Sequence, residues 1–292
     1  GDWLIIEADE SDGSVVQYEP EIGLLLNIDK DHQEINGLIE LFTIFKSNTN
    51  SLFIVNQSNT IAKSLSANSK NDFGFENEDA GYSAENFKQD GLSLTFEVLN
   101  QKFQMNSLGQ HSVENASAAI AVANQIGVDL KTCAESLAKY EGIYRRHQIL
   151  GQKNGVWVID DYAHNPAKCA ASIKACQPLA EKVIAWFQPH GYKPTRFLKD
   201  DFIQEIADSL RPLDEIYMSE IFYAGGTAVK DISAKDLVDG ITAKGKNAYF
   251  VEDRNDLLKA IKPKLEEGTV LLIMGARDPS LETFCKNLYE NL

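Results

Sequence analysis

The segment DDYAHNP, residues 160–166, places two carboxylates, a phenol and an imidazole directly after the apolar run 156–159. A short apolar run of this kind is typical of a buried strand, and ligands of open α/β sheets dock beyond the carboxyl ends of such strands. Asp160 and Asp161 could accept hydrogen bonds from a ribose or bind a metal ion, and His164 can titrate near neutral pH. The segment therefore predicts the edge of an active site. The alternative is a polar loop that caps a helix starting at the proline.

Two further apolar runs, residues 4–6 and 22–26, are each followed by a cluster of acids. The first leads into EADESD at 7–12, and the second leads into NIDKDH at 27–32, which ends in a histidine. Oxygen-rich clusters with a single imidazole suit Mg²⁺ or Mn²⁺, whereas zinc sites use more cysteine or histidine. The clusters indicate a hard-cation site, and the alternative is a pair of solvated loops in an acidic protein.

The elements that must position these clusters alternate between apolar runs and helical patterns, which is typical of an α/β fold with a mainly parallel sheet. Residues 66–110 differ, because alternating apolar positions among Gly, Asn and Ser predict β-hairpins. A boundary near Gly142 divides the sequence into residues 1–142 and a Rossmann-like domain at 143–292. The predicted strands are 4–6, 22–26, 52–56, 156–159, 182–187, 214–219, 248–251 and 269–274. The predicted helices are 38–45, one that Ser112 caps and Gly127 ends, 130–139, 167–175, 199–210, 234–244, 255–266 and one at the C-terminus.

Composition restricts the partners of the chain. The 292 residues carry a formal net charge of −15, which argues against nonspecific nucleic-acid binding and would repel a polyphosphate. A bound nucleotide would then need Mg²⁺ and local cations, for which Arg145 and Arg146 are candidates. The four cysteines have no C-x-x-C spacing and indicate reduced thiols, and no apolar stretch reaches the roughly 18–20 residues of a membrane span. With no signal-peptide pattern, we expect a cytoplasmic protein.

Seven segments occur in a characteristic order: EADESDGS, NIDKDH, GQHSVENASAA, YRRHQILG, DDYAHNP, FQPH and VLLIMGARD. In this order they resemble the Mur ligases, the ATP-dependent amide-forming ligases of peptidoglycan synthesis, over essentially the whole chain. The resemblance implies part of a central ATPase domain followed by a Rossmann-like C-terminal domain. It also implies that ATP phosphorylates the carboxylate of a UDP-N-acetylmuramate-type substrate. An amino acid, with L-alanine the leading candidate, then attacks the acyl phosphate.

One motif of the family is missing. Mur ligases hold the ATP triphosphate on a P-loop, G-x-x-x-x-G-K-[ST], and the only Gly-Lys pair here, at 245–246, lacks the upstream glycine and the hydroxyl residue. In the family, the P-loop and the domain that binds the UDP-sugar precede the EADESD strand. We therefore expect the chain to begin partway through the ATPase domain, to bind ATP weakly and to be inactive as this fragment.

The resemblance assigns roles to individual residues. Glu7 matches a carboxylate that binds Mg²⁺, and His32 matches the histidine at the second metal, beside the acyl phosphate. Asn115 matches an asparagine that contacts adenine, although Ser112 replaces a second asparagine of that motif. The remaining matches are Arg146 at the nucleotide, Asp161 at the ribose hydroxyls, and Tyr162 and His164 at the reacting carboxylate and incoming amine.

The largest departures from the family fall in the domain that presents the amino acid. The segment FQPHGYKPTRF has Gly191 and Pro194 at positions where the family has arginines that hold carboxylate or phosphate groups. Lys193 and Arg196 are the predicted replacements, although neither reproduces a bidentate fork at the original position. The motif MGARDPSL also differs from the usual G-A-G-D-I. The sequence therefore supports the reaction class more strongly than the identity of the acceptor amino acid.

His190 is predicted to share one substrate pocket with Tyr162 and His164. The strands that end at 159 and 187 follow one another in sequence, and consecutive parallel strands are usually neighbours in the sheet. We therefore expect both motifs to project into one cleft. The alternative is that His190 packs behind the loop.

Three interpretations of the function stay open. The first is an ATP-dependent Mur ligase that joins an amino acid to UDP-N-acetylmuramate. The second is a related ligase with another amino-acid or peptide acceptor, including the folylpolyglutamate and cyanophycin types. The third is a truncated paralogue that binds a nucleotide or a partner without catalysis.

Overall fold

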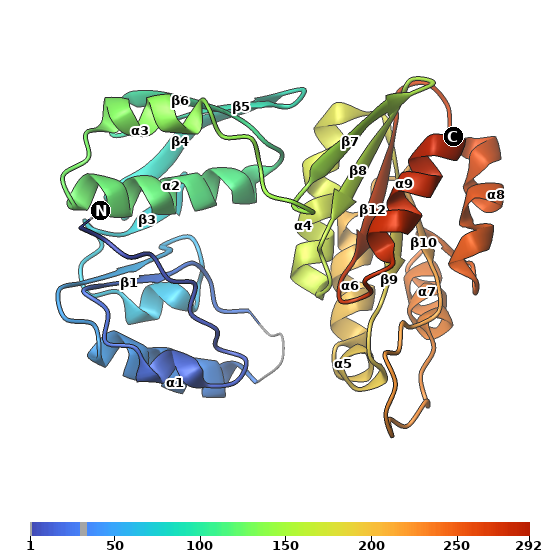
Figure 1. The fold of residues 1–292 in the computed structure, drawn as a ribbon, viewed down its shortest axis with the longest axis horizontal. Helices are drawn as coiled ribbons and strands as arrows, with labels where there is room; N and C mark the ends of the chain where they lie inside the picture. Colours follow the sequence, from blue (N-terminus) through green and yellow to red (C-terminus); the bar gives the residue numbers. More distant parts are fainter. Residues whose placement is uncertain (1, 30–33) are drawn as a thin grey trace. The chain divides into compact units, whose positions relative to one another are not determined.

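The computed structural model describes residues 2–29 and 34–292. The chain forms two compact units. The first comprises the described residues up to 88 with 94–106 and 110–140, and the second comprises 89–93, 107–109 and 141–292. Each unit has its own strands and its own hydrophobic cores (Figure 1). None of the helices in the described ranges is long and apolar enough to cross a membrane.

The first unit is built around a two-stranded parallel ribbon and a four-stranded sheet. Its elements are η1 (Ser14–Gln17), β1 (Ile22–Leu25), α1 (Ile35–Ser47), β2 (Leu52–Val55), η2 (Ala62–Leu65), β3 (Phe73–Phe75), β4 (Tyr82–Asp90), β5 (Ser93–Val98), β6 (Gln101–Asn106), α2 (Gln110–Gln125) and α3 (Leu130–Leu137). Alternate residues of the ribbon face opposite sides, so that Leu25 and Val55 join a core with α1. Leu24 and Ile54 pack on the other side, in a core with α2 (Figure 1).

The apolar run Leu4–Ile6 was predicted as a buried strand, and this prediction is wrong. Leu4 is 83% exposed and Ile5 is 93% exposed, and the run has no secondary structure. Within the described residues, β1 pairs with β2 alone, and no strand lies beside residues 4–6. The run therefore has neither backbone hydrogen-bond partners nor an apolar surface to cover it.

The start of α2 also differs from the prediction, whereas α3 starts at Leu130 as predicted. Helix α2 begins at Gln110, so Ser112 lies inside its first turn and does not cap it. The next helix, α3, is capped by Asp129, whose carboxylate accepts a hydrogen bond from the Thr132 backbone N–H at 2.9 Å. An acceptor side chain at this position satisfies one of the unpaired N–H groups of the first turn.

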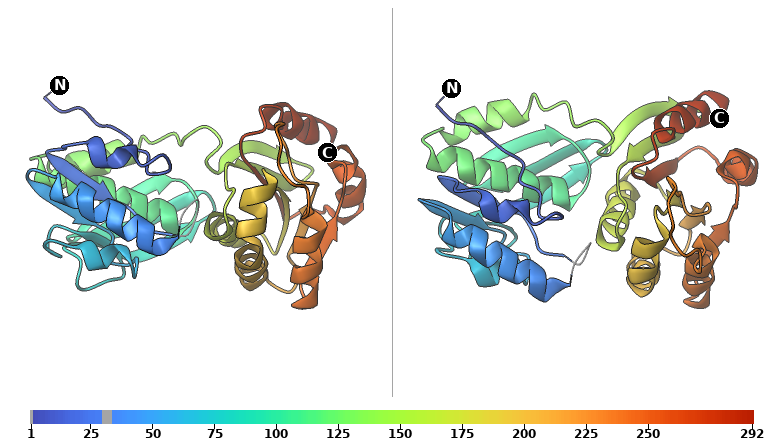
Figure 2. Two further views of the ribbon diagram at one scale, coloured as in Figure 1. Left: turned by 90° about the horizontal axis from the view of Figure 1, so that it is seen from below. Right: turned by 60° about the horizontal axis from the view of Figure 1, so that its bottom comes forward.

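The second unit is a six-stranded sheet between two layers of helices (Figures 1 and 2). Its elements are β7 (Gln148–Lys153), β8 (Val156–Asp161), α4 (Pro166–Cys176), η3 (Gln177–Leu179), β9 (Lys182–Gln188), α5 (Tyr192–Phe197), α6 (Lys199–Ser209), β10 (Glu215–Met218), α7 (Ala234–Ala243), β11 (Asn247–Phe250), η4 (Arg254–Asp256), α8 (Leu257–Ile261), η5 (Lys262–Lys264), β12 (Thr269–Gly275) and α9 (Leu281–Asn291). The strand order is β11-β10-β9-β12-β8-β7. All neighbouring pairs are parallel except β7 and β8.

Residues of β9 explain why helices cover both faces of this sheet. Val183, Ala185 and Phe187 belong to a core with α4, α6 and α7, whereas Ile184 and Trp186 belong to a core with α8 and α9. All five side chains are fully buried. A strand buried on both faces reads as a continuous apolar run, as this one does in the sequence.

The topology of the second unit corrects the predicted neighbours. Strands β8 and β9 are consecutive parallel strands, but β12 lies between them and pairs with both. Strand β7 was not predicted, and it adds an antiparallel edge to β8. The helix predicted at 255–266 is broken into η4, α8 and η5, because Pro263 cannot continue the α-helical hydrogen bonding.

Candidate active site

Three rings lie in a row at the carboxyl ends of β8 and β9 in the second unit. The ring centroids of Tyr162 and His164 are 5.6 Å apart, and those of His164 and His190 are also 5.6 Å apart. The two motifs therefore lie close together, although their strands are not neighbours, and a shared substrate cleft stays a prediction. We call Tyr162, His164 and His190 the ring row.

Backbone contacts hold the two histidines of the ring row. Nδ1 of His164 lies 3.0 Å from the carbonyl oxygen of Tyr162. The loop of His190 is bridged to Phe222, because the Phe222 N–H donates to Pro189 at 2.8 Å and the Gly191 N–H donates to Phe222 at 2.9 Å. Gly191 has a φ of +73°, which favours glycine at the position where the family has an arginine.

The two acids that end β8 are buried and do not face an open cleft. Arg145 donates to Asp160 through Nε at 3.0 Å and Nη2 at 3.3 Å, and Nη2 also donates to the carbonyl of Gly275 at 2.9 Å. Arg145 is only 8% exposed, so it is not a free surface cation, and its suggested role at a bound nucleotide stays a prediction. Burial raises the pKa of Asp160, and the Arg145 guanidinium opposes this shift.

Asp161 is turned toward the backbone of its own unit. Its carboxylate accepts hydrogen bonds from the N–H groups of His147 at 3.2 Å and Tyr162 at 3.0 Å. His147 is buried beside it, with Nε2 3.7 Å from Asp161 Oδ2 and 3.0 Å from Ser172 Oγ. Burial lowers the pKa of His147, although the charge of Asp161 partly offsets this effect. A ribose contact of Asp161 stays a prediction.

Arg146 lies at a hollow of about 430 Å³ beside the ring row. Its guanidinium carbon is 5.5 Å from the centroid of Tyr162, a distance at which cation–π attraction operates. The hollow is lined by Tyr144, Arg145, Arg146, Tyr162, Asp278, Pro279 and Glu282. An exposed guanidinium on an aromatic wall could bind an anionic group of a ligand.

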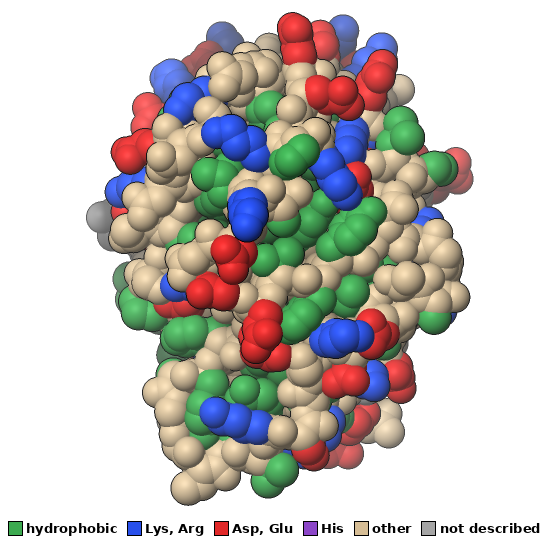
Figure 3. Space-filling model, turned by 90° about the vertical axis from the view of Figure 1, so that its right-hand side faces the viewer, with side chains coloured by type: hydrophobic (Ala, Val, Ile, Leu, Met, Phe, Trp, Pro, Cys, Tyr) green, Lys and Arg blue, Asp and Glu red, His purple; other side chains and the backbone are tan. Residues whose placement is uncertain are grey.

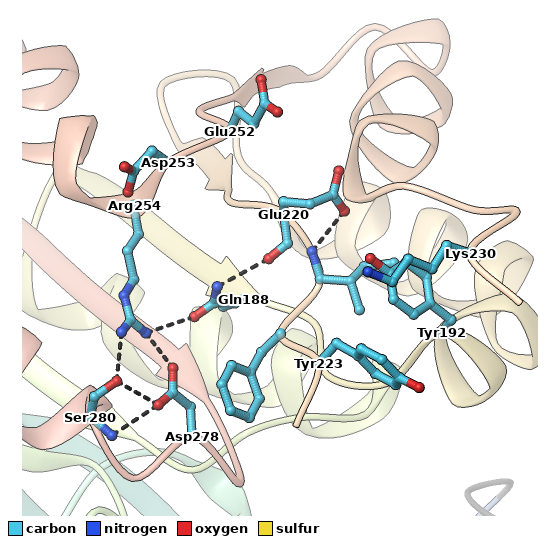
Figure 4. A pocket seen from close by; sticks show the side chains of 12 residues that line it. Gln188, Tyr192, Glu220, Tyr223, Lys230, Glu252, Asp253, Arg254, Asp278 and Ser280 are labelled. Atoms are coloured by element: carbon cyan, nitrogen blue, oxygen red, sulfur yellow. Dashed lines mark hydrogen bonds and ion pairs between the residues drawn. The ribbon is translucent and has the colours of Figure 1, made fainter. Parts of the chain in front are cut away.

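A second hollow, of about 420 Å³, lies beyond the ends of β9 to β12, and we call it the charged hollow (Figure 4). Arg254 crosses one side of it and donates to Gln188 Oε1 at 3.0 Å, to Ser280 Oγ at 2.6 Å and to Asp278. Lys230 lies over the rings of Tyr192 and Tyr223 on another side. The acidic residues of its lining are Glu220, Glu252, Asp253 and Asp278.

The charged hollow contains residues that the sequence did not single out, chiefly Arg254, Glu220 and Lys230. They come from separate loops, and no local pattern marked them. On the face drawn in Figure 3, acids and bases are interspersed and form no continuous basic surface. The absence of a nucleic-acid partner stays a prediction from the net charge.

The other predicted site residues lie apart from the ring row or are already paired. Arg196, on α5, forms an ion pair with Asp231 and donates to the carbonyl of Val229 at 3.2 Å. Lys193, on the same helix, is exposed. Asn115 is exposed on α2 in the first unit. The predicted roles of all three stay predictions.

The described residues do not test the predicted metal site. Glu7 is exposed in the extended N-terminal segment, and His32 lies outside the described residues. Over residues 2–29 and 34–292, no group of three or more His, Cys, Asp or Glu side chains could hold a metal ion. Magnesium binding by Glu7 and His32 stays a prediction from the sequence.

Comparison with known proteins gives the family. Residues 2–123 match the Mur ligase middle domain, and residues 145–277 match the Mur ligase glutamate ligase domain. UDP-N-acetylmuramate–L-alanine ligases from Myxococcus xanthus and Caldanaerobacter subterraneus are 31% and 32% identical, each over 94% of this chain. The chain spans 61% and 62% of their lengths.

A solved structure has the same fold. The crystal structure of a UDP-N-acetylmuramate–alanine ligase from Thermotoga maritima aligns with a TM-score of 0.74 and 24% identity. The alignment covers 97% of this chain and 62% of that one. Both units thus match Mur ligase domains, in the order expected from the sequence motifs. The chain belongs to the Mur ligase family.

Proposed function

We propose that the whole protein is an ATP-dependent ligase of peptidoglycan precursor synthesis that joins L-alanine to UDP-N-acetylmuramate. Family membership supports the reaction class, and the names of the two relatives support the acceptor. The observation that carries the proposal is the ring row, which brings Tyr162, His164 and His190 together at the carboxyl edge of the sheet. This edge is where α/β domains bind their ligands.

In this proposal the reaction proceeds in two steps. The carboxylate of the sugar attacks the γ-phosphorus of ATP, which forms an acyl phosphate and releases ADP. The neutral amine of the amino acid then attacks the acyl carbon, a tetrahedral intermediate collapses, and phosphate leaves. The amine nitrogen must lose one proton to become an amide nitrogen. His164 and His190 are the candidates to accept that proton, because imidazoles titrate near neutral pH.

The acceptor amino acid is assigned to the second unit, at the ring row and the charged hollow. Phe222 supports this assignment, because it lines the hollow and its backbone is bonded to both neighbours of His190. ATP and Mg²⁺ belong to the whole protein in this proposal, with Asn115 and Arg146 as nucleotide contacts and Glu7 and His32 as predicted metal ligands. The present chain, which has no P-loop, is proposed to be inactive by itself.

Steady-state ADP release by the whole protein tests the proposal. The assay would combine UDP-N-acetylmuramate with L-alanine, glycine, L-serine or a dipeptide. We expect turnover with L-alanine, and we expect His190→Ala to lower kcat by about 100-fold, in the range for loss of a general base. His190→Asn keeps a polar side chain without a titrating group and should be as slow.

Two outcomes would contradict the proposal in different ways. Turnover only with another amino acid or a peptide would support ligase activity but contradict L-alanine as the acceptor. ADP release that no acceptor stimulates would reject ligase activity and favour a paralogue without this catalysis.

A further inference from the structure

Arg277 occupies a strained position in the loop that connects β12 to α9. Its φ is +62°, in the left-handed region that favours glycine. The Asp278 N–H donates to the carbonyl of Ala276 at 2.8 Å, so Arg277 is the central residue of a three-residue turn. A turn of this kind with a positive central φ is rare and strained. Strain of this kind in a side-chain-bearing residue is a reason to look for a function.

The strained turn lies directly against the ring row. The Arg277 N–H donates to the hydroxyl oxygen of Tyr162 at 3.3 Å. The next residue, Asp278, lines both the charged hollow and the hollow beside Arg146. The Arg277 backbone therefore contacts the ring row and directly precedes a residue that lines both hollows, although Arg277 itself lines neither. A long, flexible side chain at this point can reach a ligand in either place.

The neighbouring cations are already engaged. Arg145 is paired with Asp160, and Arg254 is paired with Asp278. Arg146, which lies over the ring of Tyr162, is the proposed nucleotide contact, and Lys230 lies over two tyrosine rings. Arg277 is exposed, and its guanidinium makes no hydrogen bond or ion pair with any residue that the structure describes. The turn thus carries an uncommitted guanidinium on a residue whose backbone contacts the ring row.

The charges around the ring row match the two ends of an amino acid. Acids of the charged hollow, such as Glu252 and Asp253, are suited to an ammonium group. A guanidinium is the group that binds a carboxylate in planar, bidentate geometry. Arg196, the replacement predicted from the sequence, is already paired with Asp231. Arg277 is therefore the better placed donor for the carboxylate.

We propose that Arg277 binds the α-carboxylate of the acceptor amino acid and so selects an amino acid over other amines. This inference rests on the proposed ligase function. The inference also explains why a residue with a side chain occupies the strained turn. Glycine would be less strained at this position, but it has no side chain to bind the substrate.

The test uses the substitution that the backbone prefers. In the whole protein, Arg277→Gly should leave the melting temperature equal or higher, because glycine relieves the positive φ. It should raise the KM for L-alanine at least about tenfold, through loss of a charge-assisted pair, while kcat and the KM for ATP change by less than about threefold. Arg277→Lys keeps the positive charge but lacks the planar pair of N–H donors. Its KM for L-alanine should therefore lie between those of the wild-type protein and Arg277→Gly.

L-Alaninamide, which has the amine but no carboxylate, separates carboxylate binding from other roles. The wild-type protein should prefer L-alanine to L-alaninamide, and Arg277→Gly should lose most of that preference. Leu99→Gly is the matched control, because Leu99 is an exposed residue with a φ of +50° in the turn between β5 and β6 of the first unit. Leu99→Gly should relieve backbone strain without changing the KM for L-alanine or the KM for ATP.

The contrary outcomes are distinct. Normal wild-type turnover with an unchanged KM for L-alanine in Arg277→Gly would overturn the inference alone. An equal loss with L-alanine and L-alaninamide would also overturn it, because the guanidinium would then act on another group. No turnover of the wild-type protein with any acceptor would reject the proposed function and this inference with it.

Discussion

Three segments of the chain share one sequence pattern, a short apolar run followed by acids, and two of them, residues 156–161 and 4–6, differ because only the first forms a strand. Residues 156–161 form β8, which pairs with β7 on one side and β12 on the other. Residues 4–6 have no such neighbours among the described strands and stay exposed. The pattern therefore indicates a segment that would have to be buried as a strand. Whether it forms a strand depends on whether neighbouring strands are present to pair with it.

The acids that follow the two runs differ in the same way. Asp160 and Asp161 are buried at the end of β8, where Arg145 and backbone N–H groups pair with their oxygens. Glu7 follows the unpaired run and is exposed. The two acids at the end of β8 thus hold the loop that carries the ring row through their hydrogen bonds. Glu7, on a segment without strand neighbours, holds no loop in this way.

Removing Arg145 should give the largest effect on stability. Arg145→Ala would leave the Asp160 carboxylate buried without its partner, which costs about 3–5 kcal/mol for pairs of this kind. Urea unfolding of the present chain, followed by circular dichroism, would measure the free energy of unfolding. By contrast, Lys131→Ala removes an exposed cation 4.0 Å from Glu135 and should cost about 0.5 kcal/mol or less.

A double variant separates the ion pair from the packing around it. Arg145→Met combined with Asp160→Leu removes both charges and should regain much of the lost stability, because neither charge is then left unpaired. If Arg145→Ala cost less than about 1 kcal/mol, the Asp160 carboxylate would be reached by water, and the contrast with Glu7 would be lost.

Two isoleucines test the two apolar runs directly. Ile159 is fully buried in β8, and Ile5 is 93% exposed in the N-terminal segment. Ile159→Ala should lower the free energy of unfolding by about 2–5 kcal/mol, the range for such truncations in a core. Ile5→Ala should change it by about 0.5 kcal/mol or less. Similar losses in both variants would mean that residues 4–6 are buried in solution.

Local sequence patterns predicted most elements of the second unit, though not β7 or α5, and the proximity of His164 and His190. They did not predict that β12 lies between β8 and β9, because strand order depends on contacts between distant parts of the chain. The Arg145 guanidinium, for example, also bonds the carbonyl of Gly275, 130 residues further along. The charged hollow escaped prediction for the same reason, since its residues come from separate loops. The strain at Arg277 is a backbone property that only the fold reveals.

His147 gives the smallest and most specific prediction, a change in the pH dependence of stability. Burial lowers the pKa of its imidazole, so the folded chain resists protonation while the unfolded chain takes up a proton below about pH 6.5. Stability is therefore lost as pH falls below that value, by at most about 1.4 kcal/mol per pH unit. His147→Phe and His147→Gln remove this titration but keep the carboxylates. Unfolding free energies at about pH 7.5 and about pH 5.5 should differ by roughly 1 kcal/mol less in these variants than in the wild-type chain.

An equal difference in all three proteins would mean that His147 is protonated in the folded chain as readily as in the unfolded one. The buried loop at the end of β8 would then be open to water, as the segment around Glu7 is.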